Sequence, residues 1–142
     1  MAPEERSAWV MVVVSAVSYV TYVAIILASA RTVPLTEVPY ATTLLWTVGG
    51  AIVAGIVLAI AITIAWPDQI GKKDQRDREI HRYGEYTGQW CLVAGGVAGL
   101  AMAMAEVDHF YIANVLYLAF VLSSILGSVL KIIAYRRGLP TW

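Results

Sequence analysis

One short segment of the chain, "AEVDHF" at residues 105–110, carries residue types that could bind a metal ion. Glu106 and His109 stand three residues apart, and in a helix this spacing places a carboxylate and an imidazole on one face, as in di-iron bundles. A di-iron site needs a second such pair and two further glutamates, whereas this chain has one pair. Asp108 fits equally well as the N-cap of a following helix, with Glu106 as the polar end of the preceding one. Glu106, Asp108 and His109 are therefore weak metal candidates.

The rest of the residue inventory provides no catalytic site. The single cysteine, Cys91, excludes an intrachain disulfide and a Cys-x-x-Cys redox pair. The sequence offers no buried His pair for haem and no Gly-rich phosphate loop. Its formal net charge of zero gives no indication of nucleic-acid binding. We therefore expect a protein that is not an enzyme and holds no cofactor.

The densest charge lies in "KKDQRDREIHRYGEYTG", residues 72–88. Asp74 fits the N-cap of a helix, and opposite charges recur three or four residues apart, which supports a solvated helix. These pairs are Asp74–Arg78, Asp77–His81 and Glu79–Arg82. Acidic residues balance the basic ones here, unlike in a polybasic lipid-binding patch. The segment is either a connector that fixes topology or a docking face for a cytosolic protein, which would depend on Asp74, Arg76, Asp77, Arg78, Glu79 and Arg82.

The composition of the whole chain is that of a membrane protein. Of its 142 residues, 59% are hydrophobic and 14% charged, with a mean hydropathy of +0.69. Soluble domains average about 25% charged residues. Four runs, residues 8–30, 41–66, 86–105 and 110–130, contain no Asp, Glu, Lys, Arg or His. Each is long enough to cross a hydrocarbon core of about 30 Å as a helix, the form that pairs every backbone group internally.

The sequence therefore predicts an all-α fold, a bundle of four transmembrane helices forming one domain over residues 1–142. The expected spans are residues 8–30, 41–66, 86–106 and 110–134. A charged segment, residues 67–85, is expected as a cytoplasmic helical extension leading into the third span. The "LASA" at residues 27–30 is similar to a signal-peptidase site, but the apolar run is longer than the roughly 7–15 residues of a signal peptide's apolar h-region. We expect an uncleaved first span.

The distribution of basic residues predicts the orientation. Nine of the ten Lys and Arg residues fall on one side of the expected spans, and Arg31 alone falls on the other. The positive-inside rule places the nine in the cytoplasm. Both termini and the charged segment are then cytoplasmic, in a bacterial plasma membrane protein.

Small residues predict close helix packing. Gly84, Gly88, Gly95 and Gly99 recur at spacings of four, seven and four, along one face of the third helix. Such faces let helix backbones approach closely in lipid. Gly50–Ala54, Ser123–Gly127 and Ser124–Ser128 repeat the spacing. Packing within the chain is the default, and a homodimer is the alternative. Ser15, Tyr19 and Tyr22 form a polar stripe that we expect to hydrogen-bond across the bundle.

Two segments, "DQRDREIHRYGEYTG" and "AMAEVDHFYIANVLYLAFVLSSILGSVLKIIAYRRG", resemble small bacterial integral membrane proteins catalogued as domain of unknown function 2178. The resemblance covers about the C-terminal half of the chain and includes the Asp-x-Arg-Asp pattern at Asp74, Arg76 and Asp77. It implies a small helical membrane protein, often encoded beside a helix-turn-helix regulator. It assigns no catalytic residue.

Together these patterns predict a non-catalytic inner-membrane protein that acts as an interaction or regulatory partner through its charged helix. Its expected partners are membrane lipid, a cytosolic protein and, as the alternative noted above, a second copy. A small oligomeric transporter is the alternative function. Proton-coupled transport needs an ionisable residue within the membrane, and the four runs contain none. Lys131, the nearest, is expected to snorkel to the cytoplasmic end.

Overall fold

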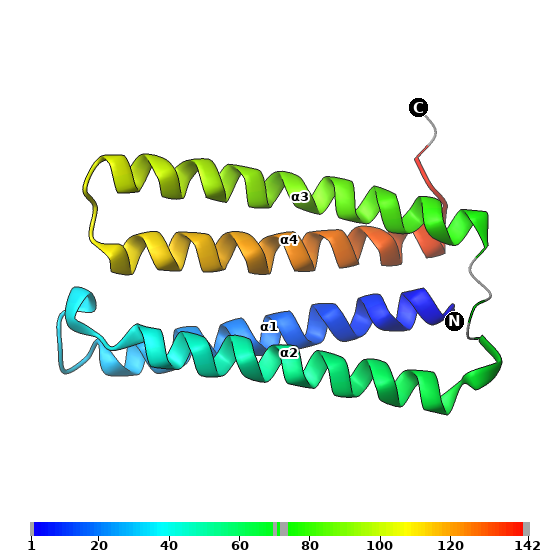
Figure 1. Cartoon of the computed structure of the whole chain (residues 1–142), viewed down its shortest axis with the longest axis horizontal. Coiled ribbons are helices and arrows are strands. Elements are labelled where there is room, and N and C mark those ends of the chain that lie inside the picture. Colours follow the sequence, from blue (N-terminus) through cyan, green and yellow to red (C-terminus); the bar gives the residue numbers. More distant parts are fainter. Residues whose placement is uncertain (1, 70, 72–73, 141–142) are drawn as a thin grey trace.

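The computed structural model describes residues 2–69, 71 and 74–140 and is built from four long helices (Figure 1). They are α1 (Pro3–Ser29), α2 (Tyr40–Ala65), α3 (Gln75–Met104) and α4 (His109–Arg137). Short 3-10 turns, η1 (Leu35–Glu37) and η2 (Pro67–Gln69), precede and follow α2. The described part of the chain contains no β-strand, so the all-α prediction is confirmed. Lys72 and Lys73 lie outside the described residues.

All four helices are long and apolar enough to cross a membrane, as predicted. They have 27, 26, 30 and 29 residues, and about 20 residues suffice to cross the hydrocarbon core. The third helix is less apolar than the others, with a peak hydropathy of 1.3 against 2.1 or more. The reason is the composition of its apolar part, which contains Gln89 and four glycines, Gly88, Gly95, Gly96 and Gly99.

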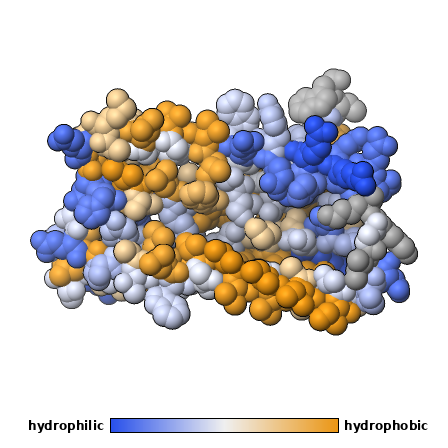
Figure 2. Space-filling model, in the orientation of Figure 1, coloured by the Kyte–Doolittle hydropathy of each residue, from blue (hydrophilic) through white to orange (hydrophobic). Residues whose placement is uncertain are grey.

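The helices pack in the order α3, α4, α1, α2. In Figure 1, α3 and α4 form one layer and α1 and α2 the other, with both termini and the α2–α3 connection at the same end. Hydrophilic residues gather most densely at that end in Figure 2. The second helix, α2, has no buried residue, and Trp46 and Ile64 are 78% and 73% exposed. In a bilayer, lipid would cover this helix.

The glycine face of α3 lies against α4. A Cβ atom at Gly84 would lie 2.6 Å from the carbonyl oxygen of Gly127, and one at Gly88 would lie 2.7 Å from that of Ser123. Added Cβ atoms at the other two glycines would meet side chains of α4, Ala119 at Gly95 and Leu116 at Gly99. The glycines thus let the two helix backbones come closer than any side chain would allow.

The similar spacing in α2 does not have this role within the chain. A Cβ at Gly50 would meet nothing within 4 Å, so the expectation that Gly50 and Ala54 pack like the α3 glycines is wrong for Gly50. The reason is the peripheral position of α2, which packs mainly on α1.

The first helix is joined to α4 by polar contacts. The hydroxyls of Ser15 and Ser124 lie 2.9 Å apart, and Tyr22 Oη donates to Asn114 Oδ1 at 2.8 Å. Two of the three expected stripe residues therefore hydrogen-bond across the bundle. The third, Tyr19, instead packs its ring on Tyr117, with centroids 5.5 Å apart.

The buried core lies around these tyrosines, toward the end of the bundle that holds the α1–α2 and α3–α4 connections. It consists of Tyr22, Ile26, Val38, Phe110, Tyr117 and Val121. The rings of Tyr22 and Tyr117 meet edge to face at 4.9 Å, a favoured aromatic geometry. This half of the bundle therefore holds the aromatic part of the core.

The contact between the α3 glycines and α4 predicts that a Gly→Ala substitution changes the free energy of unfolding in opposite directions at two positions of α3. Gly88→Ala should lower the free energy of unfolding by about 1–3 kcal/mol, because the backbone oxygen of Ser123 cannot yield to the new methyl group. Gly96→Ala should be neutral or stabilising by up to about 1 kcal/mol, since its Cβ would meet nothing within 4 Å. Thermal unfolding in detergent measures both. Equal melting temperatures for the two variants would contradict the packing of α3 on α4.

Candidate functional site

The start of α3 is fixed by its own side chains. Asp74 is the N-cap, and its Oδ1 accepts a hydrogen bond from the backbone N–H of Gln75 at 2.7 Å. Asp77 Oδ2 accepts the backbone N–H of Asp74 at 3.2 Å, which completes a capping box. The N-cap prediction for Asp74 is confirmed.

The inner face of this helix start is tied to the end of α4. Tyr135 Oη donates to Asp77 Oδ1 at 2.9 Å, and Lys131 Nζ donates to Glu85 Oε1 at 2.6 Å. Between these two contacts Ile80 is fully buried. The charged segment from residue 75 onward is thus held against a second helix over nearly three turns.

The outer face carries exposed charges that have no ion-pair partner among the described residues. Arg78, Glu79 and Arg82 are exposed, and none has a side-chain partner among the described residues. The expected pairs Asp74–Arg78, Asp77–His81 and Glu79–Arg82 are not formed in this part of the chain, so that prediction is wrong. Asp74 and Asp77 serve the capping box instead, and Asp77 also accepts from Tyr135. Arg76, also exposed, completes the predicted interaction residues.

The beginning of α1 adds a further ion pair at this end. Glu5 is buried and its Oε1 lies 3.1 Å from Nε of Arg136. The guanidinium of Arg6 lies over the ring of Trp66, 3.9 Å from its centroid, a cation–π geometry. These contacts join the first turns of α1 to the ends of α4 and α2. The sequence offered no periodic signal for them, because each partner lies on a different helix.

The Glu106 and His109 pair has a different geometry from the predicted one. Helix α3 ends at Met104, so Glu106 is not its polar end, and the expected helical face shared with His109 does not exist. Glu106 has a φ of 56°. Its N–H donates to Ala103 O at 3.1 Å, and that of Val107 to Met102 O at 3.0 Å. These two bonds are a Schellman motif, in which Glu106 occupies the position that favours glycine.

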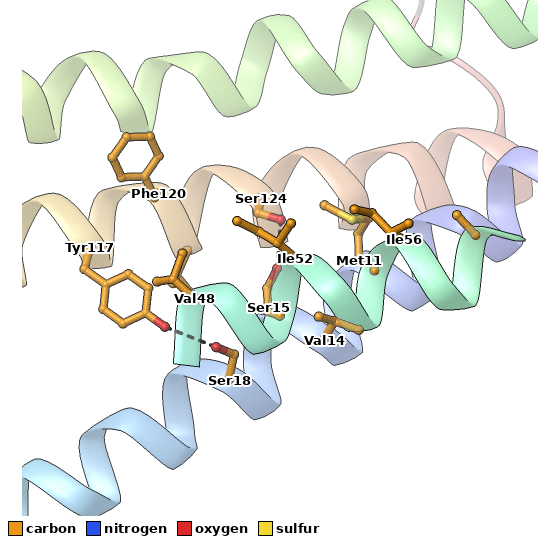
Figure 3. A pocket seen from close by; sticks show the side chains of 14 residues that line it. Met11, Val14, Ser15, Ser18, Val48, Ile52, Ile56, Tyr117, Phe120 and Ser124 are labelled. Carbon is orange, nitrogen blue, oxygen red and sulfur yellow. Dashed lines mark hydrogen bonds between the residues drawn. The ribbon is translucent and has the colours of Figure 1, made fainter. Parts of the chain in front are cut away.

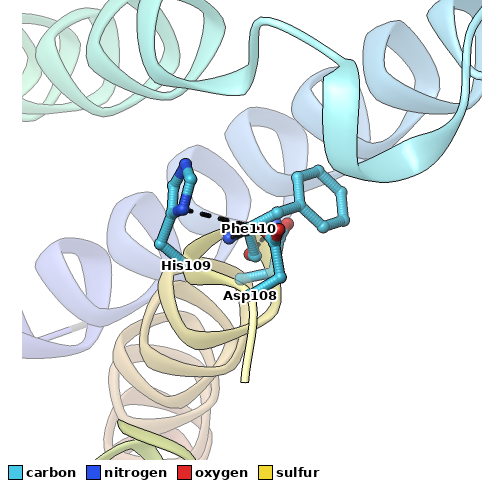
Figure 4. Close-up of polar contacts among 4 residues, drawn as sticks. Asp108, His109 and Phe110 are labelled. Atoms are coloured by element: carbon cyan, nitrogen blue, oxygen red, sulfur yellow. Dashed lines mark hydrogen bonds and ion pairs between the residues drawn. The ribbon is translucent and has the colours of Figure 1, made fainter. Parts of the chain in front are cut away.

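The neighbouring residues begin α4. Asp108 is the N-cap, as predicted, and its Oδ1 accepts the N–H of Phe110 at 2.9 Å. His109 Nδ1 lies 3.8 Å from the same oxygen, and the imidazole is 79% exposed (Figure 4). The described residues include no group of three or more His, Cys, Asp or Glu that could hold a metal ion.

Sequence reasoning did not identify the hydrogen-bond chain in the middle of the bundle. Ser18 Oγ donates to the carbonyl of Thr47 at 2.9 Å. Because Ser18 has one hydroxyl proton, the Tyr117 hydroxyl 3.2 Å away donates to it. Asn114, the sixth residue of α4, accepts from Tyr22 and donates to Phe110 O at 2.7 Å. Asn114, Tyr117 and Ser124 stand three and seven residues apart, and this spacing on one helix would have predicted a polar face of α4.

No family model, no curated protein and no solved structure matches this chain. The resemblance of its C-terminal half to the domain 2178 proteins stays an expectation.

The turn geometry predicts that Glu106 is replaceable. Glu106→Gly should raise the free energy of unfolding by up to about 1 kcal/mol, because glycine adopts a positive φ without the steric cost that other residues have. Glu106→Val should lower it, since a β-branched residue fits that conformation worst. Thermal unfolding of both variants in detergent is the measurement. A glycine variant less stable than the wild type would show that the carboxylate has a role that the turn does not reveal.

Proposed function

We propose that this chain is a non-catalytic protein of the bacterial plasma membrane that docks a cytosolic protein through the start of α3. The observation that supports this is the charge on its outer face. Arg78, Glu79 and Arg82 are exposed and unneutralised by described residues, while the helix that carries them is tied to α4. A rigid surface binds at a lower entropic cost than a mobile stalk.

A groove next to these charges offers a place for an anchoring side chain. It has a volume of about 530 Å³ and is lined by Glu79, Arg82, Tyr83, Tyr86, Leu139 and Pro140. Tyrosine and arginine are the residue types that most often dominate binding energy at protein interfaces. We name Arg78 and these six residues the docking face. Two arginines against one glutamate favour an acidic partner surface.

The proposed orientation places the docking face in the cytoplasm. Seven of the eight described Lys and Arg residues belong to the end of the bundle that holds the termini, and Arg31 lies at the other end. A bias of this size in short connections supports the cytoplasmic placement of that end. The same placement makes both termini cytoplasmic.

Reporter fusions test the orientation. Alkaline phosphatase, which is active only outside the cytoplasm, should be active when fused after Thr32 and inactive when fused after Asp68 or Gly138. Green fluorescent protein should give the opposite pattern at the same three positions. Phosphatase activity after Asp68 would place the docking face outside the cell and refute the proposal.

Site-directed crosslinking in native membranes tests the docking. A photoreactive residue at position 79 should crosslink a cytosolic protein, and the same residue at Ser7, exposed at the same end of the bundle on α1, should not. Replacing Arg78 and Arg82 together by Gln should reduce the crosslink yield at least about tenfold, because the charges that set partner choice are lost. The readout is the amount of crosslinked product at equal membrane abundance.

Arg137→Gln is the matched control, since it removes a cation from the same end without touching the docking face. It should leave the crosslink yield unchanged. If the double Arg variant also keeps the wild-type yield, the charges of α3 serve topology alone.

A further inference from the structure

A polar cavity lies between α1, α3 and α4, near the end that holds the termini. Its volume is about 380 Å³, and its lining includes His81, Glu85, Lys131 and the serines Ser7, Ser123, Ser124 and Ser128. Lys131 is the only Lys or Arg among the described residues that line it. The side chain of Lys131 is 14% exposed and that of Glu85 is 64% exposed. The cation is thus held inside, whereas its carboxylate partner lies at the edge of water.

Gly84 is the reason that Lys131 can lie inside. A Cβ at position 84 would come within 2.5 Å of Cγ and 2.8 Å of Cε of Lys131. The aliphatic part of the lysine therefore crosses α3 where that helix has no side chain. The snorkelling of Lys131 stays a prediction, and its ammonium group donates to Glu85 Oε1, on a side chain that is 64% exposed.

An apolar cleft continues from this cavity. It lies between α1, α2 and α4, has a volume of about 430 Å³ and is walled by Val14, Val48, Ile52 and Ile56 (Figure 3). The hydroxyls that reach it are already bonded, Ser15 to Ser124 and Ser18 to Tyr117. Its surface therefore suits a hydrocarbon chain.

Three residues line both spaces: Met11, Phe120 and Ser124. The polar cavity and the apolar cleft thus adjoin, with the mostly covered side chain of Lys131 at one end and apolar side chains along the rest. The cation lies toward the end of the bundle with the charged residues, and the cleft extends from Met11 toward Tyr117. An amphiphile placed along them would have the head-to-tail direction of a lipid in the leaflet on that side.

We propose that these two spaces form a binding site for a long-chain carboxylate, with its headgroup on Lys131 and its alkyl chain in the cleft. One ammonium group matches one carboxylate in charge, and a charge-assisted hydrogen bond would join them. The cleft that adjoins the cavity at Met11, Phe120 and Ser124 would hold the alkyl chain. On binding, the carboxylate takes the place of Glu85, whose mostly exposed side chain turns to water at little cost.

The site is independent of the docking face. Both include residues of helix α3, but no residue lines both the docking face and the carboxylate site. In particular, Arg78, Glu79, Arg82 and Tyr86 do not line the carboxylate site. Binding of the carboxylate can therefore be tested in purified protein without a partner.

Equilibrium binding of radiolabelled palmitate to the full chain in an uncharged detergent is the experiment. Unlabelled palmitate should compete fully. Hexadecanol, which keeps the chain and lacks the charge, and octanoate, which keeps the charge on a shorter chain, should each compete at least about tenfold more weakly. Lys131→Gln should weaken palmitate binding by a similar factor, and Glu85→Gln should strengthen it about two- to fivefold by removing the competing carboxylate.

Two glycines supply a matched pair for the cleft. A Cβ at Gly55, which lines the cleft, and one at Gly96 on α3 would each meet nothing within 4 Å. Gly55→Leu should therefore fill the cleft without disturbing the fold and weaken palmitate binding about tenfold or more. Gly96→Leu, and Arg137→Gln as the charge control, should bind as the wild type does.

Three results would overturn the proposal. Equal competition by palmitate and hexadecanol would show that Lys131 does not bind the headgroup. Equal binding by the Gly55→Leu and Gly96→Leu variants would show that the chain does not enter the cleft. Competition by phosphatidylglycerol as effective as that by palmitate would assign the site to a two-chain bilayer lipid. If Lys131→Gln does not fold, the Glu85→Gln variant and the hexadecanol comparison decide the role of the charge.

Discussion

The close contact of α3 with α4 is the constraint on which the other features of this structure depend. Lipid tails are as apolar as the side chains between helices, so association in a bilayer relies on van der Waals packing and internal hydrogen bonds. Gly84 and Gly88 remove side chains from α3 where Gly127 and Ser123 of α4 present their backbones. The helices approach there, and the two polar contacts of the α3 start become possible, Tyr135 with Asp77 and Lys131 with Glu85.

The same arrangement accounts for the internal spaces. Helices α1 and α3 both pack on α4 rather than mainly on each other, and α1 is attached through hydrogen bonds such as those of Ser15 and Tyr22. Toward the α1–α2 and α3–α4 connections the aromatic core of Tyr22, Phe110 and Tyr117 fills the interior. Toward the termini no comparable cluster of large side chains is present among the described residues, and the polar cavity with Lys131 lies there. The aromatic cluster therefore lies toward one end of the interior and the polar cavity toward the other.

Charge divides the start of α3 into two faces with different roles. The inner carboxylates, Asp77 and Glu85, bond groups of α4 and stabilise the fold. The outer charges, Arg78 and Arg82 among them, contribute little to folding because exposed ion pairs are weak and these have none among the described residues. Charged side chains that form no ion pair within the fold can contact a partner protein. Because the helix that carries them is held against α4, their arrangement is fixed and can select a partner with complementary charge. This division underlies the proposed docking function.

The sequence by itself determined the four apolar helices, since uncharged runs of this length have one stable form in lipid. It also predicted Asp74 and Asp108 as helix caps, because capping depends on residues adjacent in the chain. The inward turn of Lys131 and the positive φ of Glu106 depended on the tertiary structure. Lys131 has an apolar path inward only where Gly84 of another helix lies beside it, and Glu106 leaves the helix only because α3 must reverse toward α4. Periodicity along one helix carries no information about which residue of another helix will face it, so those contacts were decided by packing alone.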